Sequence, residues 1–85
     1  MKGELPEEAF AWPIFFRRFL RLPEEKRVRI AELVGMEPQQ AIEHPKYFAA
    51  QVYAILCFAR KYWRTLPVEL RQILVEVATT VLRGE

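Results

Sequence analysis

The chain has 85 residues, of which 52% are hydrophobic and 13% aromatic, and its formal net charge is +2. This length predicts a single domain, residues 1–85, with a modest core, because a short chain buries a smaller fraction of its surface than a long one. The only cysteine, Cys57, excludes an internal disulfide, and the absence of serine, aspartate and asparagine excludes a serine nucleophile and an aspartate dyad. Since Cys57 lies in an apolar run, we expect a buried, inert thiol.

Nothing in the sequence indicates a secretory signal or a membrane span. The apolar stretch near the N-terminus is broken by Pro13 and ends in arginines. The longest apolar run, residues 48–59, contains Gln51 and is too short to cross a bilayer. We therefore expect a cytoplasmic protein that does not bind membranes. The lack of asparagine, with charge carried by Glu and Arg, is typical of a thermophilic source.

Helical periodicity and start signals predict an all-α fold, a small four- to five-helix bundle. The motifs LPEE (twice) and LPVE place proline at a first helical position and glutamate in the first turn, where both are favoured. Gly35 is a candidate C-terminal cap. The predicted helical segments are residues 6–21, with Pro13 as a possible break, 23–34, a short turn of helix at 38–43, 45–64, and 67–83.

The first segment, AFAWPIFFRRFLRL, concentrates aromatic residues. The simplest interpretation is packing in the core. A second is an interface with a partner or a second copy, where aromatics and arginine are enriched. A third, a helix lying on a membrane surface, is disfavoured because the arginines bunch at one end. The aromatic interface candidates are Trp12, Phe15, Phe16 and Phe19, together with Tyr62 and Trp63 later in the chain.

Residues 29–46 resemble a helix-turn-helix motif in part. Ala31 and Gly35 fall at the tight-packing and turn positions, but Ala41 and His44 stand where bulky aliphatic residues are usual. Pro45 would also cut the second helix short. Glutamates among the groove-facing positions oppose DNA phosphates. We interpret the stretch as a glycine-capped helix followed by a short linking turn.

The last two long helices have more apolar surface than one face can hold. In residues 45–64, one stripe contains Phe48, Val52, Ile55, Ala59 and Tyr62, and a second contains Tyr47, Ala50, Ala54, Cys57 and Phe58. The last helix likewise adds a stripe of Val68, Val75 and Leu82 to its main apolar face. Because one small core cannot cover all of this, we expect self-association as a homo-oligomer.

Basic residues cluster at two places in the sequence. If short connections return the third long helix to the junction of the first two, these clusters meet in one basic pole. Such a pole would bind nucleic acid or an acidic protein surface, with Tyr62 and Trp63 available for stacking on bases. An alternative is that these residues complement helix dipoles and cover apolar surface. The candidate anion-binding residues are Arg17, Arg18, Arg21, Lys26, Arg27, Arg29, Arg60, Lys61 and Arg64.

No residue pattern indicates catalysis, a cofactor or a small-molecule substrate. His44 and Cys57 are too few ligands for a zinc site, and the three glycines form no phosphate-binding loop. The sequence therefore predicts a non-enzymatic, self-associating helical interaction module that binds nucleic acid, or a nucleic-acid-handling complex, through the basic pole. The alternative is a protein–protein adaptor or inhibitor with an aromatic surface and no nucleic-acid binding.

Overall fold

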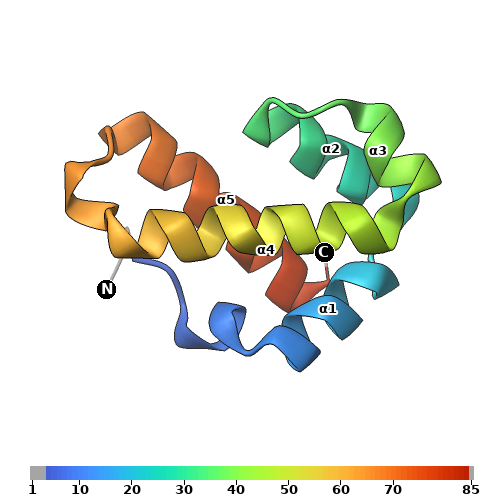
Figure 1. Ribbon diagram of the computed structural model, residues 1–85, viewed down its shortest axis with the longest axis horizontal. Helices are drawn as coiled ribbons and strands as arrows, with labels where there is room; N and C mark the ends of the chain where they lie inside the picture. Colours follow the sequence, from blue (N-terminus) through green and yellow to red (C-terminus); the bar gives the residue numbers. More distant parts are fainter. Residues whose placement is uncertain (1–3, 85) are drawn as a thin grey trace.

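The computed structural model describes residues 4–84 and is all-α over this range, with no strand. Five α-helices and two short 3-10 helices follow one another along the chain (Figure 1). The elements are η1 (Glu7–Phe10), α1 (Trp12–Arg21), α2 (Glu24–Val34), α3 (Pro38–Glu43), α4 (Pro45–Lys61), η2 (Trp63–Thr65) and α5 (Val68–Arg83). The predicted small all-α bundle is confirmed.

Proline marks the start of every α-helix. Pro38 and Pro45 occupy the first residue of their helices and Pro13 the second, while Pro23 and Pro67 immediately precede theirs. A proline costs nothing at these positions because the first helical N–H groups have no partner within the helix. The segment predicted over residues 6–21, with a possible break at Pro13, is divided at Ala11 into η1 and α1, so the chain does break there.

Gly35 ends α2 in the left-handed conformation, with φ of 75° and ψ of 25°, which confirms it as the cap. The amide of Gly35 donates to the carbonyl of Glu32 at 3.3 Å, and the amide of Met36 donates to the carbonyl of Ala31 at 2.8 Å. These two bonds form a Schellman motif. The motif turns the chain sharply, so that α3 packs back against α2.

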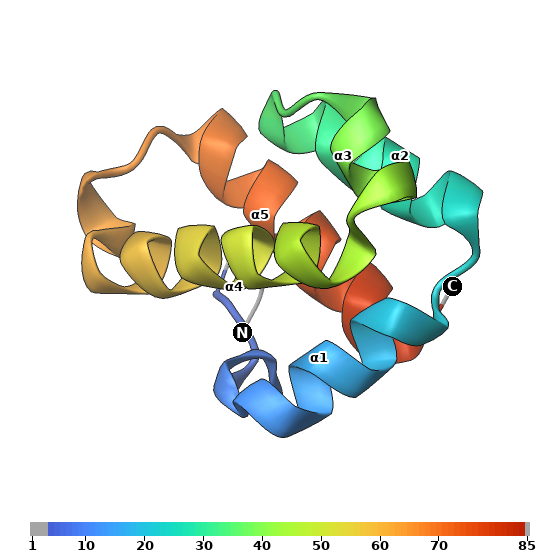
Figure 2. The ribbon, with the colours of Figure 1, turned by 45° about the vertical axis from the view of Figure 1, so that its right-hand side comes forward.

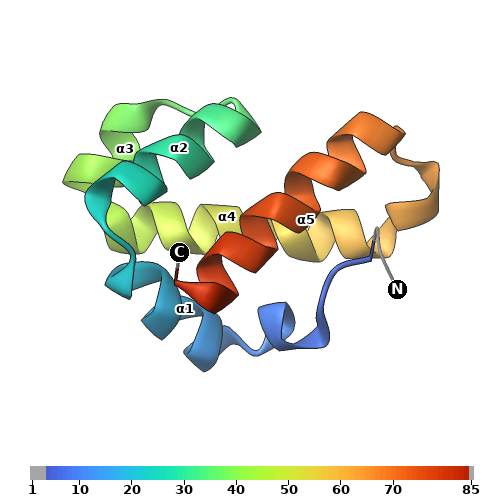
Figure 3. The same cartoon turned by 180° about the vertical axis from the view of Figure 1, so that it is seen from behind.

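The elements form two groups around α4, which lies across the front of the molecule in Figure 1. The pair α2 and α3 lies over the start of α4, and η1 and α1 lie on its other side (Figure 2). Helix α5 crosses behind α4 and contacts α1, α2 and η1, as the view from behind shows (Figure 3). One face of α4 is therefore covered and the other is not.

The core lies where α1, α4 and α5 meet. Phe15 and Phe19 of α1 and Phe48 of α4 are fully buried, and the rings of Phe19 and Phe48 meet edge to face at 5.6 Å. None of the buried residues is polar or charged over residues 4–84, so burial there is driven by the hydrophobic effect. The remaining large buried side chains are Leu22, Ile30, Val52, Leu56, Leu74, Val77 and Val81.

Candidate functional site

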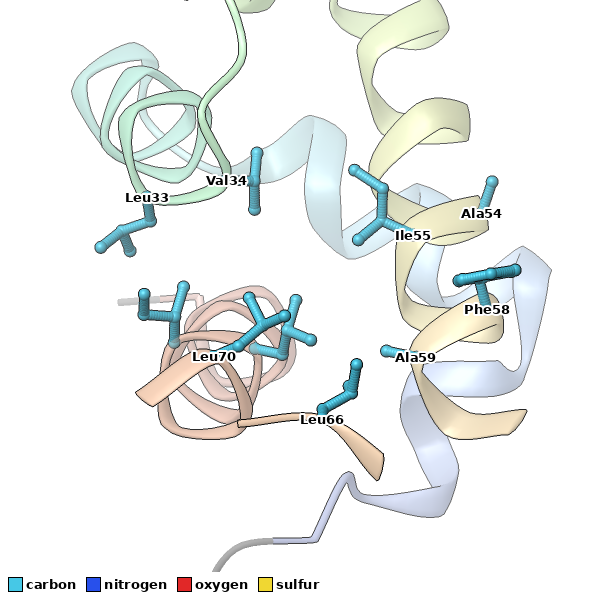
Figure 4. Close-up of a pocket in the computed structure, with 10 residues that line it drawn as sticks. Leu33, Val34, Ala54, Ile55, Phe58, Ala59, Leu66 and Leu70 are labelled. Atoms are coloured by element: carbon cyan, nitrogen blue, oxygen red, sulfur yellow. The ribbon is translucent and has the colours of Figure 1, made fainter. Parts of the chain in front are cut away.

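The described residues form an apolar groove with a volume of about 520 Å³. Figure 4 shows Leu33 and Val34 of α2 on one side, Leu66 and Leu70 opposite them, and α4 on the third side. We call this feature the apolar groove. Its ten lining residues carry no polar or charged side chain: Leu33, Val34, Ala54, Ile55, Phe58, Ala59, Leu66, Leu70, Ile73 and Leu74.

The groove exists because α2 and α5 diverge. Near the closed end, Arg29 of α2 and Glu76 of α5 form an exposed ion pair at 3.3 Å. The Schellman turn at Gly35 then ends α2 while the start of α5 lies farther away (Figure 1). Helical spacing puts Leu66, Leu70 and Ile73 on the same apolar face of the last helix as Leu74, Val77 and Val81, but only the last three are buried in the core. The first three line the groove instead.

The single basic pole is not formed, because α4 runs in the opposite direction from the one expected. Arg27, near the start of α2, donates to the carbonyl of Ala41 at 3.3 Å, which places the start of α4 beside the junction of α1 and α2. At the far end of α4, Arg60 pairs with Glu7 at 2.9 Å and lies over the ring of Phe10 at 4.3 Å. A 17-residue helix spans about 25 Å, so the two basic groups lie at opposite ends of α4.

Helix α3 is the physical reason for this reversal. The sequence interpretation treated residues 38–43 as a linking turn that left the chain at the far end of α2. In the structure, α3 packs back along α2 and carries the chain to the end from which α2 began. The chain makes one additional reversal, and α4 therefore carries Arg60, Lys61 and Arg64 away from Arg17, Arg18, Arg21 and Lys26.

Several of the basic candidates already have partners within the protein. Arg18 donates to the carbonyl of Leu82, and Arg27 donates to the carbonyls of Leu22 and Ala41. Arg18, Arg21 and Arg83 line a small depression where α1 and α5 both end. Cations at the ends of these helices complement the negative poles of their dipoles, which lowers the attraction of the depression for anions.

The structure divides the aromatic interface candidates. Phe15 and Phe19 are fully buried, so they are wrong as surface residues, and core packing is the correct interpretation for them. Trp12 is 36% exposed and packs on Phe16 and on the ring of Tyr53. At the other end of the molecule, Tyr62 is 41% exposed and contacts Phe58, whereas Trp63 is half-buried against the core.

The outward face of α4 is exposed and apolar. Phe48, Val52 and Leu56 fill the core, while Tyr47 and Phe58 remain 61% and 66% exposed. Cys57 is also exposed, so its predicted burial is wrong: it belongs to the second stripe of α4, which no element covers. Tyr53, one turn before Cys57, donates to the carbonyl of Phe10 at 2.8 Å. Burial, and then Cys57, raise the pKa of Tyr53 above its ordinary value, although Arg60 opposes this.

The described residues contain no group of three or more metal-binding side chains, and none of their helices is long and apolar enough to span a membrane. His44 lies exposed between α3 and α4, and the nearest acidic neighbour in sequence, Glu43, accepts from Gln39 at 2.9 Å. Comparison of the chain with known protein families, curated proteins and solved structures found no match. The candidate site is therefore the apolar groove, defined by its own geometry.

Proposed function

We propose that this chain is a non-enzymatic protein–protein interaction module that binds an apolar helical segment of a partner in the apolar groove. The observation that carries the proposal is a groove of about 520 Å³ lined by ten apolar residues. An amphipathic helix binds such a groove by inserting side chains spaced one turn apart. Burial of apolar surface supplies the free energy of binding, and the adaptor hypothesis from the sequence is thereby favoured over nucleic-acid binding. A cytoplasmic location belongs to the same proposal.

The groove is a surface feature and does not reach into the hydrophobic core. Leu74 and Ala59 are 2% and 4% exposed at its base, so the core beneath it is closed. Leu70 and Phe58, at its edge, are 38% and 66% exposed. Binding sites are typically concave and lined mostly by apolar side chains, as this groove is. An inserted partner side chain would cover Leu70 and Phe58 and leave the buried residues in place.

Nucleic-acid binding is less well supported because affinity for nucleic acid depends on the number of phosphates neutralised together. Arg18, Arg27, Arg29 and Arg60 all make hydrogen bonds or ion pairs within the protein. Those that remain are divided between the two ends of α4. Nucleic-acid binding remains the second candidate function. It would use only the basic residues at the end of α4, where Lys61 and Arg64 lie near the exposed ring of Tyr62.

Fluorescence anisotropy with a labelled model peptide tests the proposed function. The peptide is an amphipathic helix whose apolar face carries leucines one helical turn apart and no charged residue. We expect wild-type protein to bind it and Leu70→Gln to weaken binding by about tenfold, since loss of apolar burial at one side chain costs at least about 1.4 kcal/mol. Val68→Gln is the matched control: Val68 is 54% exposed on the same helix and does not line the groove.

The same assay with labelled single-stranded and duplex DNA separates the two functions. Circular dichroism would first establish that both variants remain folded. Equal peptide affinities for wild type and Leu70→Gln, or no binding of the leucine peptide at all, would contradict groove binding. DNA binding that falls steeply with salt, together with no peptide binding, would establish the nucleic-acid function in its place.

A further inference from the structure

The C-terminal end of α2 lacks the cation that the other α-helices of ten or more residues have there. Basic residues lie in the last turn of α1, α4 and α5, whereas none lies in the last turn of α2. From residue 30 to residue 45 the chain contains three glutamates and no lysine or arginine. A cation in the last turn of a helix offsets the negative pole of its dipole. The negative pole of α2 is therefore not offset by a basic residue of its own last turn.

Two backbone carbonyls at this end of α2 are available to a hydrogen-bond donor. The last four carbonyls of a helix have no partner within it. The Schellman motif uses those of Ala31 and Glu32, and no backbone amide in the described part of the chain donates to those of Leu33 and Val34. Leu33 and Val34 are also the residues of α2 that line the apolar groove (Figure 4). The negative end of α2 therefore lies at one wall of the groove.

Two exposed glutamates add to the negative charge at this wall. Glu32 lies one turn after Arg29, whose side chain reaches Glu76 of α5, so Glu32 is on the side of α2 that faces α5. Glu37 follows directly on the Schellman turn. Both are exposed, and neither forms an ion pair with another of the described residues. We call residues 32–34, together with Glu37, the α2 wall.

The α4 side of the groove carries the opposite charge. Lys61 lies one turn after Phe58, which lines the groove, and Arg64 follows in η2. Both are exposed. On the α5 side, Glu69 lies in the first turn of the helix, where it offsets the positive pole of α5 itself. A cation on a bound partner would thus be repelled at the end of α4 and attracted at the α2 wall.

We propose that the helix bound in the groove is a basic one, with a lysine or arginine beside its leucines that contacts the α2 wall. This inference rests on the proposed function and names the chemistry of the partner. The apolar stem of such a residue would cover Leu33, and its N–H groups would donate to the free carbonyls or to the two carboxylates. A contact of this kind already exists within the protein, since Arg18 of α1 donates to the carbonyl of Leu82 near the end of α5.

Fluorescence anisotropy with three matched peptides tests the inference. All three carry the same leucines and differ at one position on the border of the apolar face, which is lysine, glutamine or glutamate. We expect the lysine peptide to bind about two- to fivefold more tightly than the glutamine peptide, from the interaction of a cation with a helix C-terminus. The glutamate peptide should bind more weakly than both. These differences should shrink as salt is raised from about 0.01 M to about 1 M, because salt screens exposed charges.

Variants of the protein test whether the preference arises at the α2 wall. Glu32→Gln combined with Glu37→Gln should lower the ratio of lysine-peptide to glutamate-peptide affinity by at least about twofold. The matched control is Glu24→Gln combined with Glu25→Gln, which removes the same charge from the first turn of the same helix. Glu25 lies seven residues before Glu32, about 10 Å along the axis, so at physiological salt the control should leave the ratio unchanged.

The outcomes separate this inference from the function on which it rests. Equal affinities for the three peptides, or tightest binding of the glutamate peptide, would overturn the inference and leave groove binding in place. Failure of every peptide to bind would overturn both. A lysine preference that the control lowers as much as the α2-wall variant would reflect net charge alone, and one that neither variant lowers would arise elsewhere; either result overturns the inference.

Discussion

Replacement of Gly35 by alanine tests the element that shapes both the fold and the apolar groove. Gly35 has φ of 75°, where a residue with a Cβ is strained, yet an added Cβ would meet no atom within 4 Å. The cost is therefore confined to the backbone. An L-residue in this conformation costs about 1–2 kcal/mol, and the lower entropy of the unfolded alanine chain offsets about 0.4–1 kcal/mol of that. The expected net loss of stability is about 1 kcal/mol.

Thermal denaturation followed by far-UV circular dichroism measures this loss. For a domain of this size, about 1 kcal/mol lowers the Tm by about 4–8 °C. Gly84→Ala is the matched control, because Gly84 also has a positive φ, of 70°, and an added Cβ there would meet no atom within 4 Å. It caps the end of the last helix, where fraying relieves strain, so the loss should be smaller. An unchanged or higher Tm for Gly35→Ala would refute the argument from backbone strain.

Two further predictions concern single contacts. Tyr53→Phe removes the 2.8 Å hydrogen bond to the carbonyl of Phe10 and should cost about 1 kcal/mol in urea denaturation. The pKa of Tyr53 is raised in the folded state, so its contribution to folding stability is complete below the ordinary tyrosine pKa of 10.0 and is lost as pH rises above it. The stability of wild type relative to Tyr53→Phe should therefore fall above this pH, and a difference that stays flat or grows would contradict the reasoning. Arg29→Gln breaks the exposed ion pair with Glu76 and should change stability by less than about 1 kcal/mol, and a larger loss in thermal melts would show that the pair holds α2 and α5 together.

Local signals in the sequence predicted the helices well. Gly35 and the prolines act within a single turn, through φ and through the missing N–H, so no tertiary contact is needed to locate them. The short helix at 38–43 was predicted with the bounds that the structure shows. The end of the third long helix was less predictable: α4 stops at Lys61 and η2 follows, because the capping there uses Tyr62 and no glycine or proline marks it.

The positions of the helices relative to one another could not be predicted from such local signals. The direction of α4 depends on whether residues 38–43 link two elements or reverse the chain, and six residues support either path. Their packing against α2 decides it: Ala31 of α2 and Ala41 of α3 are both fully buried, and Arg27 of α2 donates to the carbonyl of Ala41. The sequence contains these small residues, and it placed Ala31 at a tight-packing position. It does not show which surface they pack against.

The two apolar stripes of α4 show how the remaining function follows from the fold. A helix that is apolar nearly all round must lie between two partners. Periodicity alone could not say which stripe faces inward, because both satisfy the spacing of a helix. The structure assigns Phe48, Val52 and Leu56 to the core and leaves Tyr47 and Phe58 exposed. The two most exposed large hydrophobic residues of the described chain, Tyr47 and Phe58, therefore both lie on α4, and Phe58 also lines the groove. A charged residue placed in the groove at Leu70, which is 38% exposed and outside the buried core, should therefore abolish peptide binding and preserve the fold.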